Sequence, residues 1–183
     1  ERTAMMRDWR QYGEAGAAWH DLYAGKFDFE GLVYTPPTET FDHEFSVRVG
    51  AKEVRLTHVG PAHTRGDVVA FVPADRTAYT GDILFIGGHP VVWDGPVSNW
   101  IRACDLILTW DVETIVPGHG PITDKAGVRA VKHYFEYLTI EARRRFDAGM
   151  REDEAVRDIS MLEFRDWIDG ERVIVNVATL YRE

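Results

Sequence analysis

Three residues of metal-binding type stand near the ends of predicted strands. His63 follows the segment Val-Gly-Pro-Ala, Asp82 follows Gly81, and His119 lies within Pro-Gly-His-Gly-Pro. Loops that flank strand ends are where a rigid scaffold presents functional groups. Imidazole and carboxylate are ligands suited to zinc, manganese or iron. If the three strand ends share one edge of a sheet, these side chains can converge on a metal site.

Each of these residues also has an ordinary structural explanation. A histidine between glycines and prolines is common in turns, and Gly-Asp pairs are frequent in hairpins. The glycines beside Asp82 and His119 let the backbone turn sharply, which would also bring a side chain close to an ion. The joint occurrence favours a site, but the spacing alone leaves both interpretations open.

The pattern of apolar residues predicts the elements that position these side chains. Strands are expected at 45–49, 53–59, 67–72, 77–81 and 113–118, and a loop is expected after Asp82. Helices are expected at 2–12, 98–108, 124–149, 152–159 and about 172–181. Ser98 and Thr123 are the predicted N-caps of two of them. Mostly antiparallel strands with helices on one face indicate the α+β class.

The longest predicted helix, at 124–149, has an apolar stripe that should face the core. The stripe consists of Val131, Tyr134, Phe135, Leu138, Ala142 and Phe146. The strand at 67–72 is continuously apolar, as a fully buried strand would be.

Composition excludes several classes of protein. The chain has 183 residues, which suits a single domain over 1–183, with a lead-in at 1–39, a motif-bearing core at 40–150 and C-terminal helices at 151–183. Its net charge of −9 argues against nucleic-acid binding. No apolar run approaches about 18 residues, so we expect no membrane association and a cytoplasmic location. The chain starts at Glu1, which leaves a removed targeting segment open, and the single Cys104 excludes an internal disulfide.

Three segments, GPAHTRGD, YTGDILF and IVPGHGP, resemble the second half of the metallo-β-lactamase superfamily of hydrolases in order and spacing. The resemblance implies an αββα sandwich with two divalent metals at one edge. It also implies that His63 binds one metal, that His119 binds the other and that Asp82 bridges them. The expected metal is zinc, with iron or manganese as alternatives.

The family's early H-x-H-x-D-H cluster is absent from this sequence. We therefore expect the chain to hold mainly the second half of the domain, to bind metal weakly by itself and to be inactive alone. The strand at 67–72 would then lack its partner sheet and expose an apolar face. Such a face predicts a homodimer or an association with the missing N-terminal half.

The resemblance implies a hydrolase that acts on a small molecule. A metal-activated water would attack an ester, thioester, lactone or related bond, with Asp82 as the catalytic bridging residue. Aspartate at the bridging position makes a β-lactam the less expected substrate. Two alternatives stay open: an iron-dependent oxidoreductase of the same superfamily, and a non-catalytic fragment that acts as a binding module.

Further residues near the motifs have weaker assignments. His89 and Trp93, in the loop after Asp82, are candidates for substrate binding, although a surface loop explains them equally well. Asp67 is a candidate for a carboxylate that orients a metal-bound imidazole, although a turn role is preferred.

Overall fold

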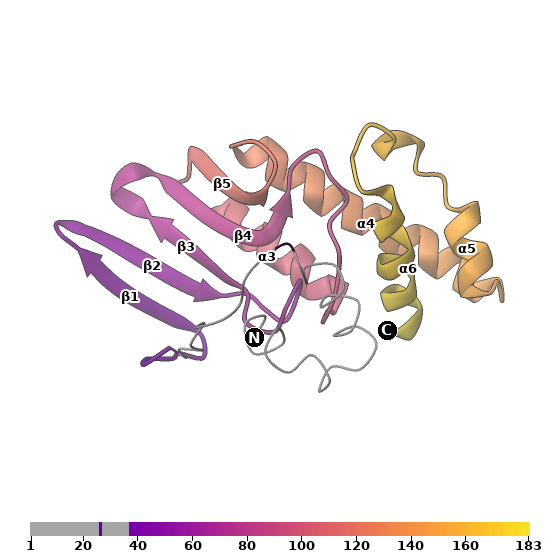
Figure 1. Cartoon of the computed structure of the whole chain (residues 1–183), viewed down its shortest axis with the longest axis horizontal. Helices are drawn as coiled ribbons and strands as arrows, with labels where there is room; N and C mark the ends of the chain where they lie inside the picture. Colours follow the sequence, from indigo (N-terminus) through magenta and orange to yellow (C-terminus); the bar gives the residue numbers. More distant parts are fainter. Residues whose placement is uncertain (1–25, 27–36) are drawn as a thin grey trace. The chain divides into compact units, whose positions relative to one another are not determined.

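The computed structural model describes residues 26 and 37–183 (Figure 1). The chain divides into two compact units, Glu1–Thr40 and Phe41–Glu183, and the description below concerns the second. The helix predicted at 2–12 lies outside the described residues. The assignment of 1–183 to one domain stays a prediction.

One five-stranded sheet forms the centre of the second unit, with its strands in the order β1-β2-β3-β4-β5. Their bounds are β1 Glu44–Val49, β2 Lys52–His58, β3 Val68–Val72, β4 Thr77–Phe85 and β5 Thr114–His119. The first four are antiparallel neighbours, whereas β5 pairs with β4 in parallel. A parallel pair needs a crossover, which helix α3 (Val97–Thr109) supplies between β4 and β5. The five predicted strands and the α+β class are confirmed.

Strand β4 is longer than predicted, and the expected loop after Asp82 is wrong for its first residues. Asp82 lies inside β4, which continues to Phe85. The reason is burial: Ile83, Leu84 and Phe85 are at most 2% exposed, and Phe85 pairs with His119 of β5. The sheet therefore holds the chain extended for three residues beyond the aspartate.

Helices α3 and α4 pack together and cover one face of the sheet (Figure 1). The bounds of the other helices are α4 Lys125–Asp147, α5 Glu152–Asp158 and α6 Val173–Arg182. The predicted stripe of α4 is confirmed for five residues, which are buried in the core: Val131, Tyr134, Phe135, Leu138 and Ala142. Phe146 is the exception, because it is 50% exposed at the end of the helix. None of the described helices is long and apolar enough to cross a membrane.

Both predicted helix caps are wrong. Pro96 is the N-cap of α3, and the backbone N–H of Val97 donates to the carboxylate of Glu183 instead of to a local side chain. Helix α4 is capped by Asp124, whose carboxylate accepts from the N–H of Ala126. The backbone of Thr123 is instead engaged in a bridge with Ile115. The cap of α3 thus lies two residues before the predicted one, and the cap of α4 lies one residue after it.

Strand β3 has no exposed side chain, so the apolar face predicted to be exposed at 67–72 is wrong. Val69 and Phe71 are buried, and Phe71 stacks on Trp110 at a ring-centroid distance of 5.1 Å. Val68 and Ala70, which alternate with them, are half-buried. The homodimer or N-terminal association inferred from that face stays a prediction.

Candidate metal centre

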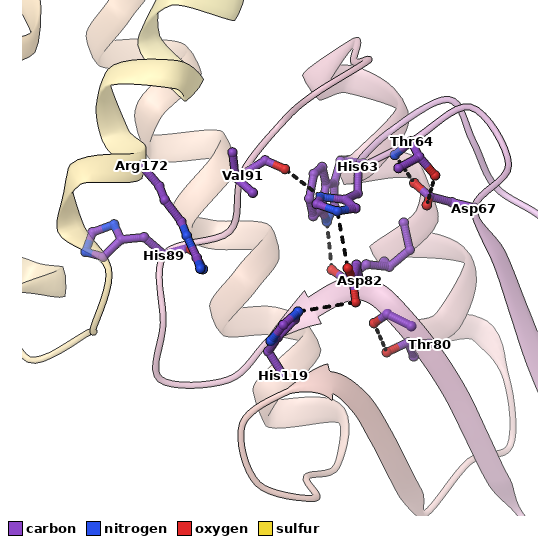
Figure 2. A network of polar contacts seen from close by, with 12 residues as sticks. His63, Thr64, Asp67, Thr80, Asp82, His89, Val91, His119 and Arg172 are labelled. Atoms are coloured by element: carbon purple, nitrogen blue, oxygen red, sulfur yellow. Dashed lines mark hydrogen bonds and ion pairs between the residues drawn. The ribbon is translucent and has the colours of Figure 1, made fainter. Parts of the chain in front are cut away.

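Three side chains that are distant in the sequence lie side by side at one end of the sheet (Figure 2). His63 comes from the loop after β2, Asp82 from β4, and His119 is the last residue of β5. The Nε2 atom of His63 lies 3.2 Å from Oδ2 of Asp82, and Nε2 of His119 lies 3.5 Å from Oδ1 of the same carboxylate. Each histidine thus faces a different oxygen of one carboxylate. Their role as metal ligands stays a prediction.

The ring of His63 is held in one orientation and one tautomer. Its side chain is buried, and Nδ1 lies 2.7 Å from the carbonyl oxygen of Val91. Because a carbonyl only accepts, Nδ1 must carry the proton, and Nε2 of the neutral ring then has a lone pair. Nε2 is itself buried, and its one polar neighbour among the described residues is the Asp82 carboxylate. A lone pair therefore faces a carboxylate oxygen, an arrangement that favours a cation between them.

The electrostatic surroundings of His63 also favour a cation beside its ring. Burial disfavours the charged ring, but the Asp82 carboxylate and the Val91 carbonyl favour it more. The pKa of His63 is consequently raised above its ordinary value. The surroundings of Nε2 therefore favour positive charge, which either a proton or a metal ion supplies.

Glycine is required at two positions of the turn that carries His119. A Cβ atom on Gly118 would fall 2.3 Å from Oδ1 of Asp82, so only glycine leaves room for the carboxylate. Gly120 has a φ of +88°, and a Cβ atom there would fall 2.1 Å from the carbonyl oxygen of Ile86. Glycine tolerates both the close approach and the left-handed backbone. The Pro-Gly-His-Gly segment thus brings His119 and Asp82 into contact.

His119 is the more accessible of the two histidines. Its side chain is 53% exposed, whereas that of His63 is 5% exposed. Its ring stacks on Phe85, with 4.3 Å between the centroids and 12° between the planes. The carboxylate of Asp82 thus connects a buried histidine to one at the surface.

The arrangement fits part of a two-metal site. Within residues 26 and 37–183, no three His, Cys, Asp or Glu side chains surround one point as a metal cage would. In the three residues, each oxygen of the central carboxylate instead faces the nitrogen of a different histidine. Such an arrangement suits a carboxylate that bridges two ions. A structural zinc ion normally has four protein ligands and a catalytic one has three, so these residues would need additional ligands.

A buried asparagine that sequence reasoning missed positions the loop that holds His63. Asn176, in α6, is fully buried. Its Oδ1 accepts from the N–H of Val92 at 3.0 Å, and its Nδ2 donates to the Pro90 carbonyl at 2.8 Å and to the Tyr134 hydroxyl at 3.0 Å. These bonds flank Val91, whose carbonyl accepts from His63. No local sequence signal links Asn176 to His63, because 84 residues separate it from Val92.

Asp67 shapes the loop of His63, as the preferred turn role predicts. Its carboxylate accepts from the N–H of Thr64 at 3.0 Å and from the Thr64 hydroxyl at 2.9 Å. Its backbone carbonyl accepts from the N–H groups of Val59 and Gly60. These contacts close the loop around His63. A direct role of Asp67 in orienting a metal-bound imidazole stays a prediction.

The two candidate substrate-binding residues lie in different surroundings. His89 is only 3% exposed, and its Nδ1 lies 3.2 Å from the Tyr134 hydroxyl. Its ring points away from His63, Asp82 and His119 in Figure 2, and burial lowers its pKa. This placement fits a packing role in the core. Trp93 is 56% exposed, and its substrate role, like that of His89, stays a prediction.

The chain matches the family model of the metallo-beta-lactamase superfamily over residues 2–119. This match covers more than half of the chain and ends at His119. The chain belongs to the metallo-beta-lactamase superfamily. The recognition based on the three motifs is confirmed.

One curated protein is also similar to this chain in sequence. The chain is 31% identical over 102 residues to the probable hydroxyacylglutathione hydrolase glo2 of Schizosaccharomyces pombe (strain 972 / ATCC 24843). That alignment covers 54% of this chain and 37% of the relative. The chain therefore spans well under half the length of this relative.

The fold is shared with solved structures of other proteins. The inverting sec-alkylsulfatase Pisa1 from Pseudomonas sp. matches with a TM-score of 0.62 at 14% identity, over 78% of this chain and 26% of that one. A metallo-beta-lactamase from Pontibacter korlensis matches with a TM-score of 0.51 at 18% identity, over 72% of this chain and 62% of that one. The metallo-β-lactamase-like fold is thus confirmed, and identities this low indicate fold alone.

Proposed function

We propose that this protein is a metal-dependent hydrolase in which His63, Asp82 and His119 are metal ligands. The observation that carries the proposal is the buried Nε2 of His63, which lies 3.2 Å from a carboxylate oxygen of Asp82 and has no other polar partner among the described residues. Its other nitrogen is fixed by the Val91 carbonyl, the arrangement commonly seen behind a metal-bound histidine. Two divalent ions bound there, with zinc expected, would acidify a water molecule toward neutral pH and polarise the scissile bond.

The residues of the chain have separate tasks in this proposal. The Val91 carbonyl keeps the Nε2 lone pair of His63 available, so that histidine serves the inner position. Asp82 offers one oxygen toward each histidine and serves as the bridge. His119, at the exposed end, serves the outer position next to the substrate. None of the three transfers a proton, because each is committed to coordination.

Within the bonds that the superfamily hydrolyses, we propose an ester or thioester of a small molecule as the substrate. A relative named as a probable hydroxyacylglutathione hydrolase favours the thioester. With three ligands among the described residues, we expect the affinity for metal to be weaker than that of a complete zinc site.

Metal binding by the full chain tests the ligand assignment. Cobalt(II) should produce visible absorption bands in the wild-type chain, and Asp82→Asn should abolish them because the bridge is lost. Asp166→Asn is the matched control, since Asp166 is 92% exposed and lies outside the site. Equal cobalt binding by wild type and Asp82→Asn would contradict the assignment.

Hydrolysis by the zinc-loaded full chain tests the activity. Thiol release from an S-acyl thioester can be followed with a disulfide reagent, because the single Cys104 is fully buried. Asp82→Asn should lower kcat/KM by at least about 100-fold, as expected when a group that positions the metal is lost. A wild-type rate no higher than that of Asp82→Asn would refute hydrolysis by this chain, and it is the result that the absent H-x-H-x-D-H cluster predicts for the chain alone.

A further inference from the structure

Arg172 extends toward the three candidate ligands from a distant part of the chain (Figure 2). It ends the short turn η4 (Gly170–Arg172), just before α6. Its guanidinium carbon lies 5.5 Å from the centroid of the Phe85 ring, and the ring of His119 stacks on Phe85 at 4.3 Å. One aromatic ring therefore holds both the cation and the exposed candidate ligand in place.

Among residues 26 and 37–183, one nitrogen of the guanidinium makes the polar contacts. Nη1 donates to the carbonyl of His89 at 2.9 Å and lies 2.9 Å from Oδ2 of Asp169. Within the described part of the chain, Nε and Nη2 make no hydrogen bond. These two nitrogens form an edge with parallel N–H donors, which matches the two oxygens of a carboxylate.

The backbone that presents Arg172 is itself unusual. Asp169 has a φ of +62°, a left-handed conformation that is uncommon for residues other than glycine. Its carbonyl accepts from the N–H of Arg172 at 3.1 Å while its carboxylate pairs with the same side chain. Strained residues of this kind concentrate at functional sites, where the surrounding structure maintains them. Asp169 thus fixes the direction of Arg172 through both backbone and side chain.

A cation at this position has a clear electrostatic consequence. The side chain of Arg172 is 28% exposed, so it is partly desolvated yet reachable by a ligand. The chain as a whole carries a net charge of −9, which repels anions at long range. A fixed local cation is therefore what an anionic substrate would need in order to dock next to His119.

We propose that Arg172 binds a carboxylate on the substrate and so selects anionic esters or thioesters over neutral ones. This inference rests on the proposed hydrolase and specifies its substrate class. Arg172 is a specificity-determining residue in this proposal, and the bond cleavage itself takes place at the metal centre. Asp169 and the His89 carbonyl position its free edge.

Two chromogenic esters of similar size separate anion recognition from hydrolysis. With the zinc-loaded full chain, mono-4-nitrophenyl succinate should be preferred over 4-nitrophenyl butyrate. Arg172→Gln should lower the ratio of their kcat/KM values by about 10- to 100-fold, the usual effect of losing a charge-assisted pair. Arg172→Lys should lower it less, because the charge remains. Arg165→Gln, whose side chain is 68% exposed and pairs with Asp166, should leave the ratio unchanged.

A purely structural Arg172 would give a different result. Loss of the Asp169 and His89 contacts would then slow both esters equally, and an unchanged ratio would overturn the proposal. Rising salt should also erode the preference for the succinate ester in the wild type, because added ions screen the pairing. A preference that does not respond to salt would count equally against it.

A binding measurement distinguishes failure of this proposal from failure of the hydrolase. If the wild type hydrolyses neither ester, the proposed function fails, and calorimetric titration of succinate into the zinc-loaded full chain decides the role of Arg172. The affinity of wild type for succinate should exceed that of Arg172→Gln by about 10-fold or more. Equal affinities, or no heat with either protein, would overturn the carboxylate assignment.

Discussion

Asn176 should contribute more to folding than any surface polar residue, because three buried groups depend on it. The side chain is fully buried and bonds to the Val92 N–H, the Pro90 carbonyl and the Tyr134 hydroxyl. Asn176→Ala would leave the Val92 N–H and the Pro90 carbonyl without their partner in the core, whereas the Tyr134 hydroxyl would keep its contact with His89. An unsatisfied buried polar group costs about 1–3 kcal/mol, so the expected loss is about 3–5 kcal/mol in the free energy of unfolding.

Urea denaturation of the metal-free chain at neutral pH measures this loss. Asn99→Ala is the matched control, because Asn99 is only partly buried and its side chain makes one hydrogen bond with the described residues, to the Pro61 carbonyl. The control should lose about 1 kcal/mol. The metal-binding readout adds a second test, because Asn176→Ala also loosens the backbone around Val91. Its cobalt affinity should fall by about 10- to 100-fold while that of Asn99→Ala is retained.

A loss below about 1 kcal/mol for Asn176→Ala would refute the reasoning about unfolding. It would mean that water reaches Val92, Pro90 and Tyr134 once the amide is gone. A large loss of stability with unchanged metal affinity would refute only the link from Asn176 through Val91 to His63.

Three further predictions concern separate parts of the molecule. Gly118→Ala should abolish cobalt binding, because its Cβ atom would displace the Asp82 carboxylate. Gly66→Ala is the control and should bind cobalt normally, since there is open space around the added atom. Unchanged binding by Gly118→Ala would be inconsistent with the site geometry. Burial raises the pKa of Cys104 to about 12. At pH 8 the thiol of the folded chain should therefore react with a disulfide reagent at least about 100-fold more slowly than the thiol of the chain unfolded in guanidinium. Rapid labelling of the folded chain would disprove the burial of Cys104. Burial lowers the pKa of His89, so the unfolded chain takes up a proton below about pH 6.5 that the folded chain resists, whereas the raised pKa of His63 acts in the opposite direction. Lowering the pH from 7.5 to 5 should therefore destabilise the wild type relative to His89→Gln, with exposed His133→Gln as the control in urea titrations, and parallel curves for wild type and His89→Gln would contradict the reasoning.

The sequence was sufficient to predict the elements and the candidate ligands. Alternation and apolar runs marked all five strands, because the period of a half-buried strand is a local property. The motifs around His63, Asp82 and His119 are likewise local, since each needs a particular residue type beside a strand end. The cap of α4 was missed by one residue because Thr123 bonds to Ile115 across the fold, a contact that no local rule contains. The cap of α3 was missed by two residues, and the N–H of Val97 is satisfied by the distant Glu183. The extension of β4 past Asp82 was missed for the same reason, since pairing with β5 decides it.

What surrounds the candidate ligands was decided by the tertiary structure alone. The Val91 carbonyl that fixes His63 lies 28 residues away, and the Pro90 carbonyl that Asn176 holds lies 86 residues from that asparagine. Arg172 reaches the His89 carbonyl across 83 residues. Sequence patterns report the local preferences of the backbone and the residue types available for chemistry. Hydrogen bonds between side chains and distant carbonyls depend on how the helices pack on the sheet, and only the folded chain specifies that packing.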